Sequence, residues 1–301
     1  MKKKIWAIGA AVMMMGALTA CSGGAGSKEA STQTGETKAE SAEEGSSAVS
    51  ESGEDKEETK QADGEKAASE GGTFTVGFDQ DFPPMGFVGE DGEYTGFDLE
   101  LAQETAKRLG LTYVAQPIAW DAKNMELESG NIDCIWNGFT MTGREDEYTW
   151  SEPYMENSQV VVVMEDSGIE TLEDLAGKIV EVQADSSAEA ALNEMPDLTS
   201  TFATLQTTPD YNTAFMDLEM GSVDAIAMDV IVAGYQMQER DGNFKILDES
   251  LAAEEYAIGF KKGNTELCEK VQKTLEEMAE DGTMAEISKK WFGEDITTVG
   301  K

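Results

Sequence analysis

Residues 73–115 read TFTVGFDQDFPPMGFVGEDGEYTGFDLELAQETAKRLGLTYVA, and this stretch sets the fold class. Apolar and polar residues alternate over Thr73–Phe78, which is the pattern of a strand. Asp98–Leu109 has helical periodicity and stops at Gly110, a residue that favours helix ends. Residues 111–115 return to a strand pattern. A strand, a helix and a second strand in this order predict a parallel α/β unit.

The alternation of strand and helix signals continues along the chain. Val160–Met164 is dominated by β-branched residues, as in a strand buried on both faces. Further strands are expected at 132–136, 179–182, 201–205, 225–228 and 256–260, and helices at 125–129, 187–194 and 208–220. A last helix places Leu267, Val271, Leu275 and Met278 on one face. About 230 residues suffice for two α/β lobes, each with its own core.

The N-terminus has the order of a secretory signal peptide, which we expect over residues 1–20. Three lysines precede the apolar segment Ile5–Leu18, which is shorter than the roughly 20 residues that span a bilayer. Leu18-Thr19-Ala20-Cys21 resembles the lipobox of bacterial lipoproteins, in which the Cys is acylated and becomes the first residue. The alternative is a plain signal peptide with an incidental Cys.

Composition separates an N-terminal tether from the folded part. Between Ser22 and Gly72 the only large apolar residue is Val49, so we expect 21–72 to be a lipidated Cys followed by a disordered acidic tether. The formal net charge is −38, of which −5 falls on residues 1–72. Such acidity repels phosphate backbones and therefore argues against nucleic-acid binding. The chain has no His, which excludes serine–histidine hydrolases and histidine-based zinc sites.

Two further cysteines, Cys134 and Cys268, lie in apolar segments and are expected as small core residues. Export permits a disulfide between them, but their spacing does not establish one.

Several motifs resemble the polar amino-acid-binding proteins of ABC importers, over residues 73–300. They are Val76-Gly77-Phe78-Asp79, Phe82-Pro83-Pro84, Gly96–Ala102, Gly130–Asp133, Asn137–Arg144, Ser151–Tyr154 and Gly221–Ala225 followed by Asp229. The resemblance implies a two-lobed periplasmic-binding-protein-like (type II) fold with a central cleft and two crossing hinge strands. The first lobe would comprise 73–156 plus 256–301, and the second 157–255. One departure is a ligand loop that is one residue shorter before Arg144.

The resemblance also implies a function. The chain would be an exported monomer, anchored by its lipid to the outer face of the membrane. It would capture a free amino acid and deliver it to permease subunits, with no cofactor and no metal. Few contacts would join the lobes without ligand, so an open form would dominate. Alternatives are an enzyme on the same pair of lobes, such as a dehydratase, and a ligand-sensing module.

A zwitterionic amino acid needs an anion site next to a cation site. Arg144 carries a planar fork that suits a carboxylate, and the alternative is an ion pair with Glu145 or Asp146. In the family, the residues matching Ser186 and Ser187 contact the same carboxylate; the alternative is an ordinary helix cap. The residue matching Asp229 takes the ammonium, and its alternative role is also an N-cap. The hydroxyl of Thr140 and a carbonyl at Gly138 would assist it.

The pocket for the ligand's own side chain would be formed by Asp79, Phe82, Trp120 and Asn137. Aromatic walls suit an aliphatic stem or a planar amide or guanidinium. Core packing is the alternative role of the two aromatic residues. These residues do not determine which amino acid binds, and polar neutral, cationic and cystine-like ligands all stay possible.

Overall fold

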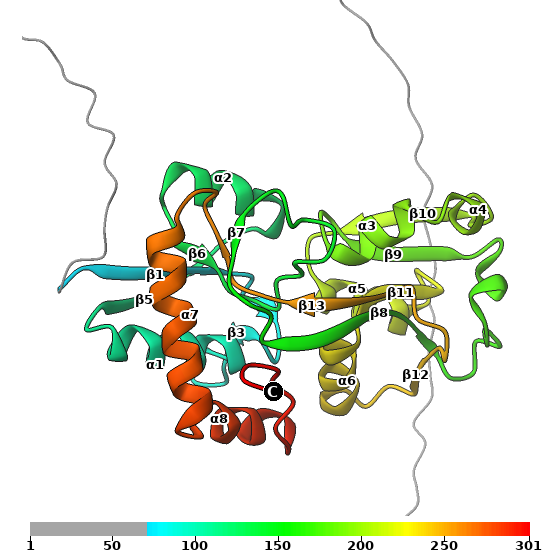
Figure 1. Cartoon of the computed structure of the whole chain (residues 1–301). Coiled ribbons are helices and arrows are strands. Elements are labelled where there is room, and N and C mark those ends of the chain that lie inside the picture. Colours follow the sequence, from blue (N-terminus) through cyan, green and yellow to red (C-terminus); the bar gives the residue numbers. More distant parts are fainter. Residues whose placement is uncertain (1–70) are drawn as a thin grey trace, which may run out of the picture. The chain divides into compact units, whose positions relative to one another are not determined.

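The structure is a computed structural model, and it describes residues 71–301 (Figure 1). The expected signal peptide, Cys21 and nearly all of the expected tether lie outside the described residues. Residues 71–301 belong to one compact unit that contains two α/β lobes. The predicted two-lobed fold is therefore confirmed.

A five-stranded sheet with the order β5-β1-β6-β14-β7 forms the first lobe. Its parallel part joins β1 (Thr73–Phe78) to β5 (Thr112–Pro117) and to β6 (Cys134–Ile135), while β14 (Gly259–Phe260) pairs antiparallel with β6 and with β7 (Thr149–Trp150). The helices of this lobe are α1 (Phe97–Arg108), η1 (Trp120–Ala122), α2 (Lys123–Ser129), α7 (Thr265–Glu280) and α8 (Thr283–Phe292). A small sheet joins β2 (Asp81–Phe82), β3 (Gly86–Val88) and β4 (Tyr94–Thr95).

A six-stranded sheet forms the second lobe. Here β9 (Ile179–Gln183) lies between β10 (Thr204–Thr208) and β11 (Ala225–Asp229), and all three are parallel. The long strand β8 (Met155–Met164) runs antiparallel to β11, to β12 (Phe244–Ile246) and to β13 (Ala252–Tyr256). The helices are η2 (Leu172–Leu175), α3 (Ser187–Asn193), α4 (Pro196–Thr199), α5 (Tyr211–Met220) and α6 (Val230–Glu239).

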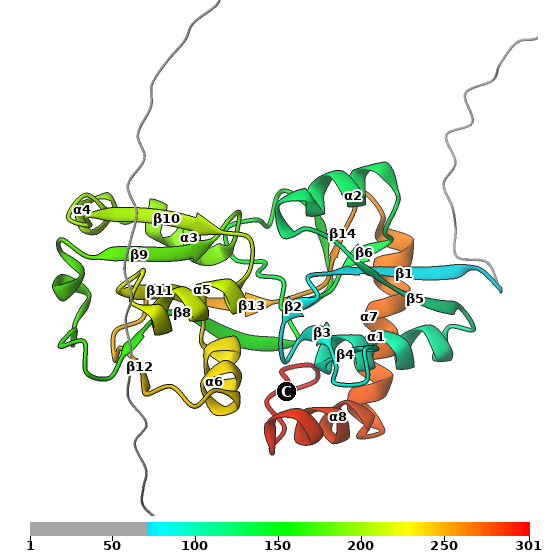
Figure 2. The ribbon, with the colours of Figure 1, turned by 180° about the vertical axis from the view of Figure 1, so that it is seen from behind.

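Strands β8 and β13 pair with each other and join the two lobes (Figures 1 and 2). Their register runs from Met155 opposite Tyr256 to Gln159 opposite Ala252, and an isolated bridge links Tyr256 to Thr140. Because Thr140 is one of the predicted ligand residues, this bridge places the predicted site beside the crossing strands. The lobe boundaries at 156/157 and 255/256 stay a prediction.

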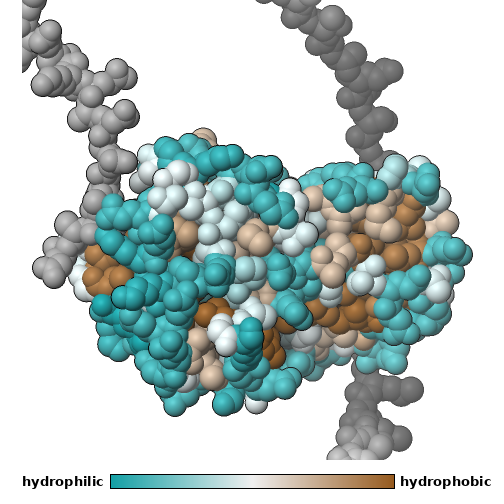
Figure 3. All heavy atoms as spheres, in the orientation of Figure 1, coloured by the Kyte–Doolittle hydropathy of each residue, from teal (hydrophilic) through white to brown (hydrophobic). Residues whose placement is uncertain are grey.

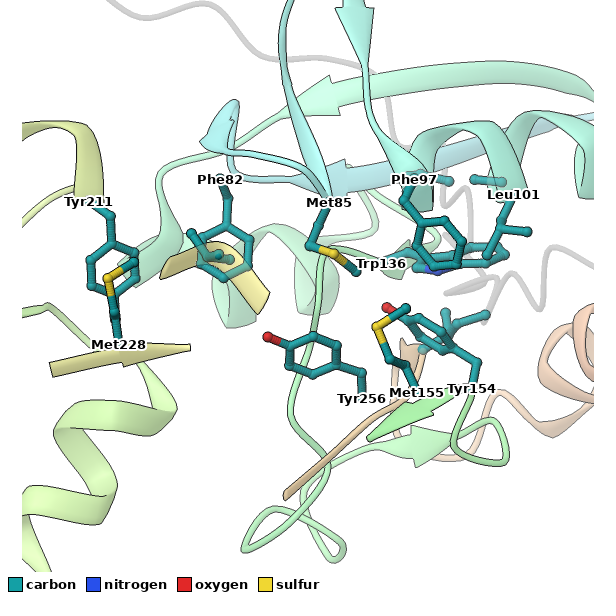
Figure 4. Packing of buried hydrophobic residues seen from close by; sticks show 14 of the residues in the cluster. Phe82, Met85, Phe97, Leu101, Trp136, Tyr154, Met155, Tyr211, Met228 and Tyr256 are labelled. Carbon is teal, nitrogen blue, oxygen red and sulfur yellow. The ribbon is translucent and has the colours of Figure 1, made fainter. Parts of the chain in front are cut away.

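The hydrophobic core continues from one lobe into the other. One cluster contains Phe97 and Trp136 of the first lobe together with Tyr211 and Met228 of the second. Figure 4 shows these side chains in a row, with Phe82, Met85 and Tyr256 between the two ends. Because the packing is continuous, it joins the cores of the two lobes.

Most expected elements are present, and the differences have local causes. The strand expected at 201–205 begins at Thr204, because α4 starts at Pro196 and its last turn continues to Thr201. The helix expected from residue 208 begins at Tyr211, because Asp210 accepts a hydrogen bond from the backbone N–H of Thr213 (2.7 Å) and caps it. The expected strand 256–260 is divided between β13 and β14.

The cysteines are placed as small core residues, and no disulfide joins them. Cys134 and Cys268 are both buried and carry free thiols.

Hydrophilic residues cover much of the face drawn in Figure 3, in keeping with the strongly acidic composition. Within residues 71–301, no helix has the length and apolar character needed to cross a membrane.

The lobes contact each other more than we expected. Instead of few contacts across the cleft, four polar pairs join the rims: Asp79–Gln183, Asp81–Asn212, Lys123–Asp185 and Thr140–Ser187. The expectation considered only the two crossing strands, whereas complementary polar side chains line both rims.

Candidate functional site

One small cavity is lined by nine of the ten predicted ligand residues. These nine residues come from both lobes, and one residue that was not predicted, Gln183, lines the cavity with them. The complete lining is Phe82, Trp120, Asn137, Gly138, Thr140, Arg144, Gln183, Ser186, Ser187 and Asp229. The cavity volume is about 10 Å³, which is close to the room one water molecule needs. The side chains of this conformation therefore lie nearly in contact.

The first lobe contributes a loop that follows β6. Gly138 has a φ of +55°, and its N–H donates to Oδ2 of the fully buried Asp98 (2.6 Å). The carbonyl oxygen of the Asn137 side chain accepts from the backbone N–H of Asp79 (3.0 Å). These bonds fix the loop from behind, so the side chain of Thr140 reaches the cleft.

Arg144 ends this loop at the edge of the cavity. Its Nη1 donates to the carbonyl of Thr140 (3.3 Å), and its guanidinium lies 5.6 Å from the centre of the Phe139 ring. Within residues 71–301 no ion pair of 4.0 Å or less forms between Arg144 and any carboxylate, including the alternatives Glu145 and Asp146. Its charge is thus available to an anion.

The second lobe contributes the start of α3. Ser186 caps this helix, since its hydroxyl accepts from the N–H of Glu189 (3.1 Å); the capping role that we considered is present, and the residue also lines the cavity. The hydroxyl of Ser187 lies 3.1 Å from the hydroxyl of Thr140 in the other lobe and accepts from Nε2 of Gln159 (2.9 Å). One hydrogen bond thus closes the cavity between the lobes.

Asp229 lies at the end of β11 and is 3% exposed. Its Oδ1 accepts from Asn157 (2.8 Å), Gln159 (2.8 Å) and the hydroxyl of Tyr256 (2.6 Å). Asp229 occupies the N-cap position of α6, as the alternative role supposes, but its side chain makes no capping hydrogen bond to that helix. Burial, and then the charge of Glu254, raise the pKa of Asp229 to about 7.

Four residues around Asp229 were not predicted: Asn157, Gln159, Glu254 and Tyr256. They alternate along β8 and β13 and so point to the same side of the crossing strands. Polar residues at every second position of a buried strand are the signal that could have revealed them.

The tenth predicted residue, Asp79, lines a larger neighbouring cavity of about 420 Å³, together with Trp120 and three more aspartates: Asp81, Asp121 and Asp210. Oδ2 of Asp79 accepts from Nε2 of Gln183 (2.7 Å) across the cleft. Burial raises the pKa of Asp79 to about 6. This second hollow is acidic and adjoins the first through Trp120.

The two aromatic residues combine packing with exposure to the cavity. Phe82 is 6% exposed, and its ring centre lies 6.0 Å from that of Tyr211. Trp120 meets Phe139 edge to face at 5.5 Å. Both therefore pack as the alternative role requires, while they also form cavity walls.

Two α/β lobes joined by paired crossing strands, with a polar cavity between them, define the class of two-lobed solute-binding proteins. The chain belongs to the bacterial extracellular solute-binding proteins, family 3, whose model matches residues 74–294. The family places it among extracellular proteins.

Relatives of known name agree with this assignment. The L-cystine-binding protein TcyJ of Escherichia coli (strain K12) is 34% identical over 231 residues, which cover 76% of this chain and 85% of that protein. A histidine-bound ABC uptake transporter substrate-binding protein from Streptococcus pneumoniae is 37% identical, with a TM-score of 0.73, covering 75% of this chain and 94% of that one. An ancestral arginine-binding protein bound to glutamine is 39% identical, with a TM-score of 0.68. The match covers 74% of this chain and 99% of that one.

Proposed function

We propose that this protein captures a free amino acid between its lobes and delivers it to the permease of an ABC importer. The observation that carries the proposal is the position of Arg144 and Asp229, which line one cavity from opposite lobes. An α-amino acid carries a carboxylate and an ammonium a few ångströms apart, and this pair of charges matches both. Cystine, histidine and arginine, for which similar proteins are named or with which they are bound, all carry that headgroup.

Each end of the zwitterion has a natural partner. Arg144 offers a charged fork to the carboxylate, with the hydroxyls of Ser186 and Ser187 on the opposite side. Asp229 accepts from the ammonium, beside the hydroxyl of Thr140. The ligand's side chain extends past Phe82, Trp120 and Asn137 towards Asp79. The hinge lies near residues 156–158 and 255–257, where β8 and β13 pair.

Mass spectrometry of small molecules released by denaturing the purified protein tests the proposal. We expect an amino acid, and calorimetry with that compound should give one site per chain. Release of a sugar, a metal or a peptide instead would overturn it. The same amino acid, incubated with the protein and recovered unchanged, would support a binding protein over an enzyme such as a dehydratase.

We further propose that Cys21 carries the lipid that anchors the protein to the outer face of the membrane. The Leu18–Cys21 sequence supports this anchor. Replacement of Cys21 by Ser should move the protein from the detergent phase to the aqueous phase, or leave it unprocessed. A cleaved Cys21→Ser protein that still partitions into the detergent phase would contradict the anchor and leave the binding function untouched.

A further inference from the structure

Asp229 shares its hydrogen-bond donors with a second buried carboxylate, that of Glu254 in β13. Nδ2 of Asn157 lies 2.8 Å from Oδ1 of Asp229 and 2.6 Å from Oε1 of Glu254. Nε2 of Gln159 lies 2.8 Å from both oxygens. The two acidic side chains are 3% and 7% exposed. Two carboxylates are thus held on the same two amides, away from water.

The cluster is short of hydrogen-bond donors. Nε2 of Gln159 carries two hydrogens but faces three acceptors, the third being Oγ of Ser187 at 2.9 Å. In addition, Oδ1 of Asn157 and Oε1 of Gln159 are buried and have no donor within residues 71–301. Buried acceptors are normally paired. A proton on one carboxylate would add a donor among the acceptors that meet at Nε2 of Gln159.

The cluster is also short of positive charge. In the described part of the chain, no Lys or Arg forms an ion pair with Asp229 or Glu254. The titratable groups that face the pair are Tyr256 of β13, Tyr211 of α5 and, across the cavity, Arg144. Burial raises the pKa of both tyrosines well above the ordinary range, so they stay neutral. Two neighbouring buried carboxylates without a cation do not both ionise readily.

We propose that Glu254 is a positioning residue for ammonium capture, which shares one proton with Asp229 in the ligand-free site and gives it up when a ligand ammonium arrives. The inference rests on the proposed amino-acid-binding function. No covalent bond to carbon changes: the shared proton leaves to solvent, and the ligand's own –NH3+ takes its place. Glu254 does not line the cavity and acts through Asp229 and through Thr140, whose hydroxyl donates to it (2.9 Å). The raised pKa of Asp229 agrees with a shared proton.

The consequence is competition between ligand and proton. Below the pKa of Asp229, affinity should fall by up to about tenfold per pH unit, since one proton must leave for each ammonium bound. Replacing Glu254 with Gln removes the neighbouring charge and keeps an oxygen acceptor. The affinity of Glu254→Gln should therefore stay high down to a pH about one unit lower than in wild type. Glu255→Gln is the matched control, because Glu255 is exposed and adjacent.

The experiment has a ligand-free arm and a binding arm. In the first, thermal unfolding of refolded, ligand-free protein is followed at pH 5 and pH 8. The unfolding midpoint of Glu254→Gln minus that of wild type should be about 3 °C larger at pH 8 than at pH 5. For Glu255→Gln this difference should be the same at both pH values. In the second, calorimetry with L-arginine and L-glutamine, whose charges are constant over this range, gives affinity at each pH.

The outcomes separate this inference from the proposed function. If Glu254→Gln follows Glu255→Gln in the ligand-free arm, the shared proton is refuted. If amino acids bind but the pH profile of affinity is the same in both variants, Glu254 has no part in capture and the proposed function stands. If neither amino acid binds to wild type, the ammonium role is refuted with these probes, and the ligand-free arm still decides whether the pair shares a proton.

Discussion

Oδ2 of Asp98 lies 2.6 Å from the backbone nitrogen of Gly138, so α1 holds the loop that carries the candidate anion site. The same oxygen accepts from the hydroxyl of Tyr154 (2.8 Å). Asp98 is completely buried, and burial raises its pKa to about 7 despite these two donors. The conformation of Gly138, with φ at +55°, thus depends on a side chain 40 residues earlier.

Removing this carboxylate should destabilise the fold and loosen the loop. Asp98→Ala leaves two buried donors without an acceptor, and we expect a loss of about 2–5 kcal/mol in the free energy of unfolding. Asp98→Asn keeps one acceptor oxygen and should cost less than half as much. Urea unfolding of ligand-free protein measures both. Equal losses for the two variants would mean that packing, not the hydrogen bonds, explains the effect.

Stability of the ligand-free protein should fall between pH 5 and pH 8. Burial raises the pKa of Asp98 and Asp229 to about 7 and that of Asp79 to about 6, against the ordinary value of 3.8. The folded chain therefore binds more protons than the unfolded chain in this window. Stability that is complete below the unfolded pKa is lost as the pH rises through the folded values. At about 1.4 kcal/mol per pKa unit, the three groups together give a loss of up to about 7 kcal/mol.

Thermal or urea unfolding at pH 5, 6, 7 and 8 measures this slope. Asp98→Asn cannot titrate and should show a shallower slope than wild type. Stability that increases over this range would contradict the raised pKa values.

Arg144 should carry most of the affinity for the ligand carboxylate. Breaking a buried charge pair by removing one partner costs about 3–5 kcal/mol, which corresponds to roughly two to three and a half powers of ten in affinity. Arg144→Ala should therefore nearly abolish binding and leave the unfolding midpoint within a few degrees of wild type. Lys178→Ala, at the other basic residue between Lys123 and Arg240, is the control. Binding within about threefold of wild type would remove Arg144 from the site.

Local sequence patterns account for most elements and for the contiguous part of the site. The helix expected at Asp98–Leu109 lies at Phe97–Arg108, because its periodicity and Gly110 are both local signals. Four residues of the loop 137–144 line the cavity together, because they are close neighbours in the sequence: Asn137, Gly138, Thr140 and Arg144.

Long-range pairing explains what the sequence did not reveal. Glu254 meets Asn157 through the register of β8 and β13, over a separation of 97 residues. Gln183 meets Asp79 across the cleft at a separation of 104 residues. The alternation of polar residues marks one side of each strand, but it encodes neither the register between β8 and β13 nor the closure of the lobes that brings Gln183 to Asp79.

An ion pair across the cleft should hold the lobes together in addition to any ligand. Lys123 begins α2 in the first lobe, and its side chain is 2% exposed. Its Nζ donates to the backbone carbonyls of Trp120 (3.2 Å) and Asp185 (3.0 Å) and pairs with the Asp185 carboxylate in the second lobe. Lys123→Met keeps the apolar stem and removes these bonds. Asp185 is half exposed and can be rehydrated, so we expect a cost of about 1–2 kcal/mol and a roughly tenfold weaker affinity.

Small-angle scattering on the unit Asp63–Lys301 distinguishes the conformations. The ligand-free Lys123→Met protein should have a larger radius of gyration than wild type, because fewer contacts favour the closed arrangement. Saturating amino acid should reduce the radius of both proteins, since a ligand that contacts both lobes favours closure by its difference in affinity for the two states. Lys107→Met removes an exposed ion pair within one helix and should change neither radius. An amino acid that binds tightly and leaves the radius unchanged would contradict hinge closure.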